Sequence, residues 1–207
     1  MTKIISGASM SIDGYIAGPE ESGFDRLFQW YENGEIEIET RMADLSFRLT
    51  PASAEYWREL IATTGAIVCG RHLFDVTSGW SGRHPMDVPV VVLTHSVPDG
   101  WERENDSFAF VTEGGIEAAV AKARELAGDK DVVVNGGQMA KQAIQAGLLE
   151  EIGVDLVPVL LGGGTPFFDR LGGPVDLEGP ISVIEGKAVT HLRYRVAGKE
   201  RQGAGVG

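Results

Sequence analysis

Short apolar runs alternate with amphipathic stretches along most of the chain. The runs are rich in Val, Ile and Leu and end in Gly, Asn, Asp or Ser, which is typical of buried strands. They lie at 4–10, 66–69, 89–94, 107–112, 131–134, 152–161, 181–185 and 189–196. Apolar positions three and four apart predict helices from Pro51, with Thr50 as N-cap, from about Leu73, and over 116–126 and 138–146.

This alternation predicts an α/β fold. We expect a three-layer α/β/α arrangement with a mostly parallel mixed sheet, because strands separated by helices form parallel pairs. The last two runs flank Gly186-Lys187 and predict a C-terminal antiparallel hairpin.

One domain accounts for the chain, since 207 residues suffice for a single core. We expect this domain to span 1–197. The acid-rich stretch 18–50, with amphipathic pieces at 24–31 and 36–45, is predicted to be an exposed insertion. The glycine-rich residues 198–207 are predicted to form a disordered tail.

Composition excludes several classes of protein. A formal charge of −12 argues against a nucleic-acid partner, because phosphate backbones require a basic face. Cys69 is the single cysteine, and the N-terminus lacks a signal-peptide pattern, so we expect a cytoplasmic protein. The apolar run 88–93 is far shorter than the roughly 20 residues of a membrane helix. The four histidines show no metal-ligand spacing, so no metal site is predicted.

Three strand-to-loop junctions have the residue types that bind an anionic dinucleotide. Asn135-Gly136-Gly137 precedes a helix whose free amides can hold a pyrophosphate, although a tight turn explains the glycines equally well. The sequence lacks the full G-x-G-x-x-G fingerprint, so a Rossmann domain is not indicated. Gly70-Arg71-His72 adds a guanidinium that can grip a phosphate, with an ordinary surface arginine as the alternative.

Thr94-His95-Ser96 adds two hydroxyls and an imidazole, with a polar loop as the alternative. Ligands in open α/β sheets bind beyond the carboxyl ends of strands, where all three junctions are predicted to lie. Together they indicate one dinucleotide site.

In this arrangement the chain resembles the dihydrofolate reductase-like fold family, and within it the branch similar to the C-terminal reductase domain of riboflavin biosynthesis. The matching segments occur in family order over nearly the whole chain. They are Ser11–Ala17, Ile67–Phe74, Val91–His95, Val132–Gly137, Asp155–Gly164 and Val189–Arg195.

The resemblance implies an NADPH-dependent oxidoreductase that transfers hydride to a small heterocycle of the pterin or pyrimidinone type, and a homodimer. It implies that Gly70, Arg71 and His72 contact the adenosine-side phosphates. Thr94, His95 and Ser96 would lie beside the 2′-phosphate and adenine. The remaining implied contacts are Gly136, Gly137 and Gln138 at the pyrophosphate, and Ala8, Ile16 and Ala17 at the nicotinamide. Arg71 and the neighbouring hydroxyls favour NADPH over NADH, because they would otherwise lack an anion.

The substrate end is less defined. In dihydrofolate reductases a carboxylate lies on the helix before the Gly-Arg turn, and counting back from Gly70 leads to Ala54 or Glu55. Glu55 is therefore a candidate acid, with a solvated glutamate as the alternative. Asp13 is a second catalytic candidate, with a turn cap as the alternative. Ser9, Ser11 and the glycine-flanked Trp80 are candidate substrate contacts, with core packing as the alternative for Trp80.

Two other functions fit the same residues. One is a dinucleotide-binding protein without robust turnover, because no proton donor is obvious. The other is a flavin- or drug-binding module that uses the same cleft.

Overall fold

An eight-stranded sheet forms the centre of the molecule, with the strand order β11-β12-β9-β1-β8-β5-β6-β7. The computed structural model describes residues 2–40, 42, 45–101 and 107–198. The strands are β1 (Ile4–Ser11), β5 (Thr64–Gly70), β6 (Val90–Leu93), β7 (Phe108–Val111), β8 (Asp131–Asn135), β9 (Glu151–Val157), β11 (Leu177–Gly186) and β12 (Val189–Val196). Neighbours from β9 to β7 are parallel, whereas β12 is antiparallel to both β9 and β11. The predicted mixed sheet and C-terminal hairpin are confirmed.

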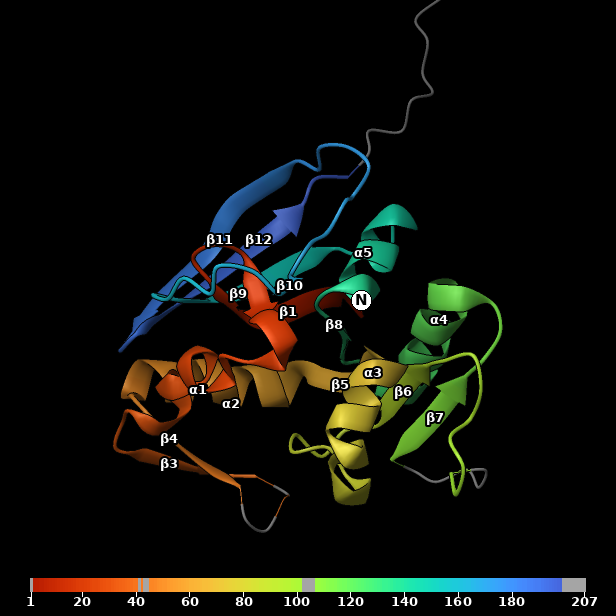
Figure 1. The fold of residues 1–207 in the computed structure, drawn as a ribbon, viewed down its shortest axis with the longest axis horizontal. Helices are drawn as coiled ribbons and strands as arrows, with labels where there is room; N and C mark the ends of the chain where they lie inside the picture. Colours follow the sequence, from red (N-terminus) through yellow and green to blue (C-terminus); the bar gives the residue numbers. More distant parts are fainter. Residues whose placement is uncertain (1, 41, 43–44, 102–106, 199–207) are drawn as a thin grey trace, which may run out of the picture.

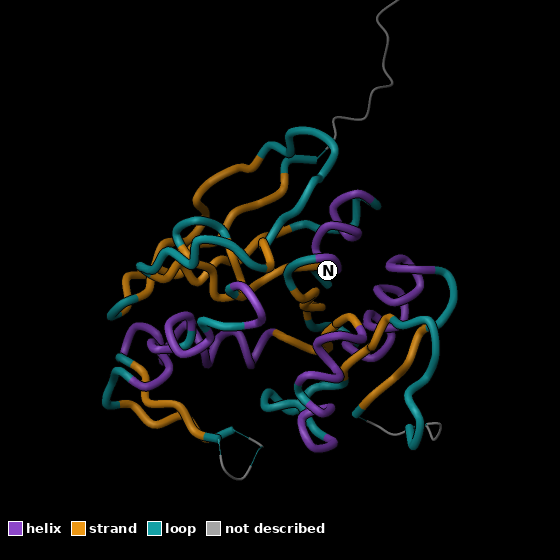
Figure 2. The backbone as a smooth tube through the Cα atoms, in the orientation of Figure 1, coloured by secondary structure: helices purple, strands orange, loops and turns teal. Residues whose placement is uncertain are grey.

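Helices cover both faces of this sheet (Figure 1). They are α2 (Pro51–Thr63), α3 (Arg71–Val76), α4 (Gly115–Ala127) and α5 (Gln138–Gln145). Successive side chains of a strand point to opposite faces of the sheet, so the residues of β5 show which helices cover each face. Ala66 and Val68 pack in a cluster with α4 and α5, while Ile67 and Cys69 pack with Phe74 of α3. The three predicted layers are confirmed, and Figure 2 shows helices on either side of the strands.

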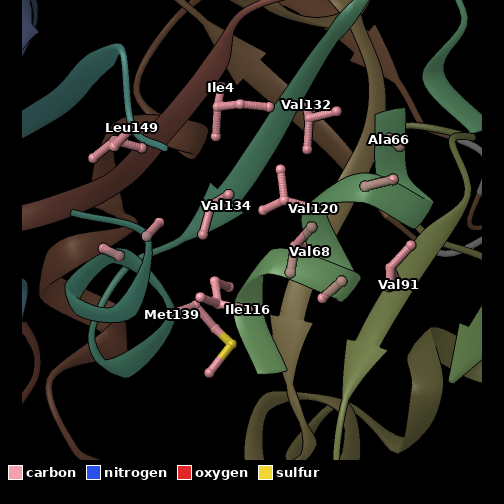
Figure 3. Close-up of a cluster of buried hydrophobic side chains, with 14 of the residues drawn as sticks. Ile4, Ala66, Val68, Val91, Ile116, Val120, Val132, Val134, Met139 and Leu149 are labelled. Carbon is pink, nitrogen blue, oxygen red and sulfur yellow. The ribbon is translucent and has the colours of Figure 1, made fainter. Parts of the chain in front are cut away.

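The largest core lies between the sheet and the α4–α5 pair. Ile4, Val68, Val132 and Val134 of the strands meet Val120 of α4 in Figure 3, and all five side chains are buried. Burial of each such side chain contributes roughly 1.5–3 kcal/mol. This core fixes the strand ends on which the candidate site is built.

The stretch 18–50, predicted to be an exposed insertion, is buried in part. It contains η1 (Pro19–Glu21), α1 (Phe24–Leu27), η2 (Gln29–Glu32) and a hairpin of β3 (Ile36–Glu39) with β4 (Ser46–Leu49). Trp30, Phe47 and Leu49 are buried in a second core with Trp57 of α2. The described acids of this stretch are exposed, and apolar residues between them pack on α2.

Other boundaries differ in ways that backbone chemistry explains. β9 ends at Val157 rather than Leu161, because Pro158 has no N–H to continue the ladder. The loop that follows leads to β10 (Thr165–Pro166), which pairs with β2 (Tyr15–Ala17) and was not predicted. The helix expected from Leu73 begins at Arg71.

Thr50 caps α2 as predicted, accepting a hydrogen bond from the Ser53 amide. The predicted tail from 199 onward lies outside the described residues. Within the described part of the chain, no helix combines the length and apolarity of a membrane span.

Candidate functional site

The carboxyl ends of β5, β6, β7 and β8 meet at one edge of the sheet, because these strands run parallel. A cleft of about 620 Å³ lies at this edge. Residues of the Gly70-Arg71-His72 and Thr94-His95-Ser96 junctions line it, together with Gln138. Most of the predicted cofactor residues are therefore brought together in one hollow.

The structure adds a fourth junction to the cleft, which the sequence analysis missed. The loop 112–114 joins β7 to α4, and its residues line the cleft together with Gly115, the first residue of α4. This junction also follows a strand, contains glycines and precedes a helix, so the pattern used for the other junctions would have predicted it.

Three helices begin at this cleft. Their N-cap residues are Gly70 for α3, Gly114 for α4 and Gly137 for α5, and among the described residues none receives a side-chain cap. The first N–H groups of a helix lack partners within the helix, and its N-terminus carries a partial positive charge. Uncapped N-termini at one hollow therefore suit a ligand with several negative charges.

Arg71 supplies a fixed cation at the cleft. Its Nε donates to Asp75 Oδ1 at 2.7 Å and to Oδ2 at 2.9 Å, one turn further along α3. Its Nη1 donates to the carbonyl of Ser96 at 3.2 Å. The guanidinium thus links α3 to the loop after β6 and retains further N–H groups for an anion.

The loop after β6 takes its shape from Thr94. The Thr94 hydroxyl donates to the Ser96 carbonyl at 2.9 Å and accepts from the Ser96 amide at 3.4 Å. Thr94 is buried, whereas His95 and Ser96 are exposed and line the cleft. Thr94 shapes the turn, and the two residues after it are available to a ligand.

His72 also lines the cleft, and it is tied to another segment. Its Nε2 makes a short contact with a carboxylate oxygen of Glu21 in η1. Both side chains are largely exposed. This contact brings a negative charge next to the predicted phosphate site.

Gly136 is required by packing, and Gly137 by its left-handed backbone conformation. A Cβ on Gly136 would lie 2.8 Å from Phe167 Cδ2 and 3.1 Å from Ile16 Cδ1. The Gly137 amide already donates to the Phe167 carbonyl at 3.0 Å, and the φ of Gly137 is 70°. Of the three residues predicted to hold a pyrophosphate, Gln138 alone lines the cleft.

A gap in strand pairing lies beside this turn. The last register partners of β1 and β8 are Gly7 and Asn135, but β1 continues to Ser11 with β9 as its partner. Beyond Gly7, no strand of the described residues pairs with the β8-facing edge of β1, and this part of β1 includes Ala8. Asn135 Oδ1 is buried at this junction without a hydrogen-bond partner among the described residues.

The other predicted nicotinamide neighbours lie in β2. Ile16 lies close to Gly136, because its Cδ1 would be 3.1 Å from a Cβ at that position. Ala17 is buried and is the register partner of Thr165 in β10. Ile16 therefore lies next to the β1–β8 gap.

Asp13 anchors a loop. Its Oδ1 accepts from the Ser11 hydroxyl at 2.6 Å and from the Leu161 amide at 3.1 Å, and its Oδ2 accepts from the Gly162 amide at 2.7 Å. The Ser11 hydrogen bond above all, with the backbone donors, lowers the pKa of Asp13 below its ordinary value. Asp13 is ionised at neutral pH, and Ser11 is buried as its partner.

Two predicted substrate-side residues lie outside the cleft. Glu55 is exposed on α2, and the neighbouring Ala54 is fully buried. Trp80 packs against His84 and Phe108, with ring centroids 4.8 and 6.4 Å apart. Because Phe108 begins β7, Trp80 belongs to the core at the opposite end of that strand from the cleft.

A buried polar cluster under α2 was also missed from the sequence. Asp155 of β9 lies 2.7 Å, Oδ1 to Nδ1, from His191 of β12, whose Nε2 lies 3.0 Å from Ser53 Oγ. Tyr56 lies beside Asp155 and stacks on the His191 ring, with the ring centroids 4.0 Å apart. Burial, then the charge of Asp155, raises the pKa of the Tyr56 phenol well above its ordinary value, so Tyr56 remains a donor. The sequence signal for this cluster was the presence of an acid and a histidine within two apolar runs that were predicted to be buried strands.

Comparison with known proteins identifies the fold as dihydrofolate reductase-like. A dihydrofolate reductase from Enterococcus faecalis, complexed with NADP(H) and RAB-propyl, superposes with a TM-score of 0.52 at 15% identity, over 94% of this chain and 96% of that one. The profile of the RibD C-terminal domain family matches residues 2–183, so the chain belongs to that family. Both the fold and the family resemblance predicted from the sequence are confirmed.

Two further structures show the same fold. A protein from Shewanella sp. PV-4, named for riboflavin biosynthesis, has a TM-score of 0.67 at 22% identity, over 95% of this chain and 99% of that one. A diaminohydroxyphosphoribosylaminopyrimidine deaminase/5-amino-6-(5-phosphoribosylamino)uracil reductase from Thermotoga maritima has a TM-score of 0.57 at 12% identity. The match covers 95% of this chain and 57% of that one. No curated protein sequence matches the chain.

Proposed function

We propose that this chain is an NADPH-dependent reductase that acts on the C=N or C=C bond of a small heterocycle of the pterin or pyrimidinone type. One observation carries the proposal: three uncapped helix N-termini and Arg71 surround a single cleft of about 620 Å³. A chain of net charge −12 can hold a polyanion only through such local groups.

The phosphate-bearing half of the cofactor fits the described cleft. We assign the 2′-phosphate to Arg71, His95 and Ser96, which provide one cation and two exposed polar side chains at the same point. The pyrophosphate would lie at the N-termini of α3 and α5, where Gln138 begins the second helix. Glu113, in the loop before α4, lines the cleft and suits an N–H or hydroxyl donor of the adenosine.

We assign the nicotinamide half to the point where β1 and β8 stop pairing, beside Asn135. The unpartnered Asn135 Oδ1 is an acceptor, and the carboxamide of a nicotinamide offers N–H donors. Ala8, Ile16 and Ala17 would give the ring apolar walls. When bound, NADPH supplies the hydride, and the protein supplies orientation and excludes water.

The test measures binding and turnover separately. NADPH and NADH are titrated by fluorescence, and the NADPH complex is then mixed in a stopped-flow instrument with pterins, pyrimidinones and flavins. The proposal expects preferential NADPH binding and oxidation by at least one heterocycle. Tight NADPH binding with no oxidation would instead support a binding protein, and failure to bind NADPH would refute the proposal.

A further inference from the structure

Another cavity lies between α2 and the β11–β12 hairpin, and no residue lines both this cavity and the cofactor cleft. Its volume is about 70 Å³, against about 620 Å³ for the cleft. A space of this size holds roughly five water molecules. It therefore admits a ligand of about five non-hydrogen atoms and is too small for a dinucleotide or a bicyclic heterocycle.

Arg193 of β12 is the cation of this cavity, and its guanidinium donates no hydrogen bond to any described residue. The Arg193 side chain is 24% exposed, and its ion-pair partner Glu151 has Oε2 3.9 Å from Nη1, which is too far for a hydrogen bond. The other oxygen of Glu151 lies 2.8 Å from Lys3 Nζ. A guanidinium has five N–H donors, so the largely buried Arg193 side chain suits an anionic oxygen.

Glu59 of α2 brings the opposite charge to the same cavity. Its side chain is exposed, and within the described part of the chain its carboxylate has neither a hydrogen bond nor an ion pair. Glu59 and Arg193 thus line one cavity without pairing with each other. Two such charges are complementary to a ligand that carries an anionic oxygen and a cationic N–H group.

Ser182 of β11 adds a hydroxyl beside Arg193. The two residues are register partners, so both side chains point to the face of the sheet that α2 covers. The Ser182 hydroxyl has no hydrogen bond among the described residues and can donate to the same anionic oxygen. Leu60 and Ile184 line the cavity with apolar surface and limit its width.

His191 and Tyr56 form a rigid wall of the cavity. Both ring nitrogens of His191 are in use, with Nδ1 2.7 Å from Asp155 Oδ1 and Nε2 3.0 Å from Ser53 Oγ. The Tyr56 ring is stacked on the imidazole, with the centroids 4.0 Å apart. A wall that is fixed before binding reduces the entropy that is lost when a ligand enters.

We propose that the cavity between α2 and the β11–β12 hairpin binds a small zwitterion of the size of glycine. The carboxylate of the ligand pairs with Arg193 and accepts from Ser182, and its ammonium group pairs with Glu59. The site lies outside the proposed cofactor and substrate positions, so this inference does not rest on the proposed function.

The test is an NMR titration of the full ¹⁵N-labelled chain with glycine. We expect amide shifts confined to 56–60, 182–184 and 191–193. The dissociation constant should be on the order of 1 mM, as suits a ligand with so few atoms. Acetate lacks the ammonium group and methylammonium lacks the carboxylate, so each should bind about tenfold more weakly than glycine.

Two substitutions separate the charges. Arg193→Gln should weaken glycine binding about tenfold or more, because the ligand carboxylate loses its cation. Glu59→Gln should bring the affinities for glycine and acetate together, because the ammonium group loses its partner. Arg195→Gln and Glu185→Gln are the matched controls, since both residues are exposed on the same hairpin and line neither cavity. Each control should change glycine affinity by less than about twofold.

Three results would overturn the site. They are the absence of glycine-dependent shifts around the cavity, equal affinities of the wild type for glycine and acetate, and unchanged glycine binding by Arg193→Gln. If Arg193→Gln does not fold, the ranking of the three compounds on the wild type decides between a zwitterion site and a simple anion or cation site. NADPH binding is measured separately, so none of these results bears on the cofactor assignment.

Discussion

Arg71 and Asp75 form a two-point contact at the mouth of the cleft, with Nε 2.7 and 2.9 Å from the two carboxylate oxygens. The contact holds the guanidinium beside the loop after β6. A flexible arginine loses side-chain entropy when it binds a phosphate. The contacts of Arg71 order its side chain before a ligand binds, so less entropy is lost on binding.

Arg71→Ala should therefore weaken NADPH binding far more than NADH binding. We expect a loss of roughly tenfold to a hundredfold for NADPH, because one charge-assisted contact to the 2′-phosphate disappears. Fluorescence titration of both cofactors measures the ratio. Arg26→Ala, an exposed arginine on α1, is the control. Equal losses for the two cofactors would remove Arg71 from the 2′-phosphate.

Glu21→Gln should strengthen NADPH binding at low ionic strength by a few-fold. The change removes a negative charge from His72 at the predicted phosphate site, and the effect should fade as salt is added. The pair is exposed, so the melting temperature should hardly move. If neither the substitution nor added salt changes the affinity for NADPH, His72 lies away from the phosphates.

Gly136→Ala should destabilise the fold by about 1–3 kcal/mol, as overpacked substitutions do. The new methyl group would lie 2.8 Å from Phe167 Cδ2 and 3.1 Å from Ile16 Cδ1, so the β2 wall of the proposed nicotinamide site must shift. Urea denaturation measures the stability. Gly173→Ala, with no atom within 4 Å of the new Cβ, is the control and should be nearly neutral. Similar values for both variants would contradict the close packing.

His84 should make stability depend on pH between about 4 and 6.5. Burial lowers the pKa of His84 from 6.5 to about 4, so in this window the unfolded chain binds a proton that the folded protein excludes. The contribution is complete above pH 6.5 and is lost as the pH falls, up to roughly 3 kcal/mol. His84→Asn keeps an acceptor for the Met86 amide and should flatten the profile in urea denaturation. If stability depends on pH in the same way in His84→Asn and in the wild type, His84 is not the group responsible.

The cofactor half of the site could be predicted because its groups sit at strand ends. Gly70-Arg71-His72 and Thr94-His95-Ser96 each follow an apolar run directly, and parallel strands bring their carboxyl ends to one edge. Gly136 and Gly137 followed the same rule, but in the structure Gly136 packs against Phe167 and Gly137 has a positive φ of 70°. A sequence shows that a position needs glycine without showing which neighbour requires it.

The buried polar cluster under α2 could not be predicted in this way. Asp155 and His191 are 36 residues apart and meet only because β12 pairs with β9 in one register. A shift by one residue would turn His191 to the other face, and no local pattern fixes that choice. The packing of Trp80 could not be predicted either, since flanking glycines indicate a loop but do not show that its tryptophan packs on Phe108.

The three helix N-termini at the cleft belong to helices that follow β5, β7 and β8. A ligand that engages all of them would tie separate elements together as a cross-link does. Binding only the folded chain, it would add about 2.7 kcal/mol to stability at a hundred times its dissociation constant. Cofactor supply in the cell would then set not only how fast such a protein works but also how long it survives proteolysis.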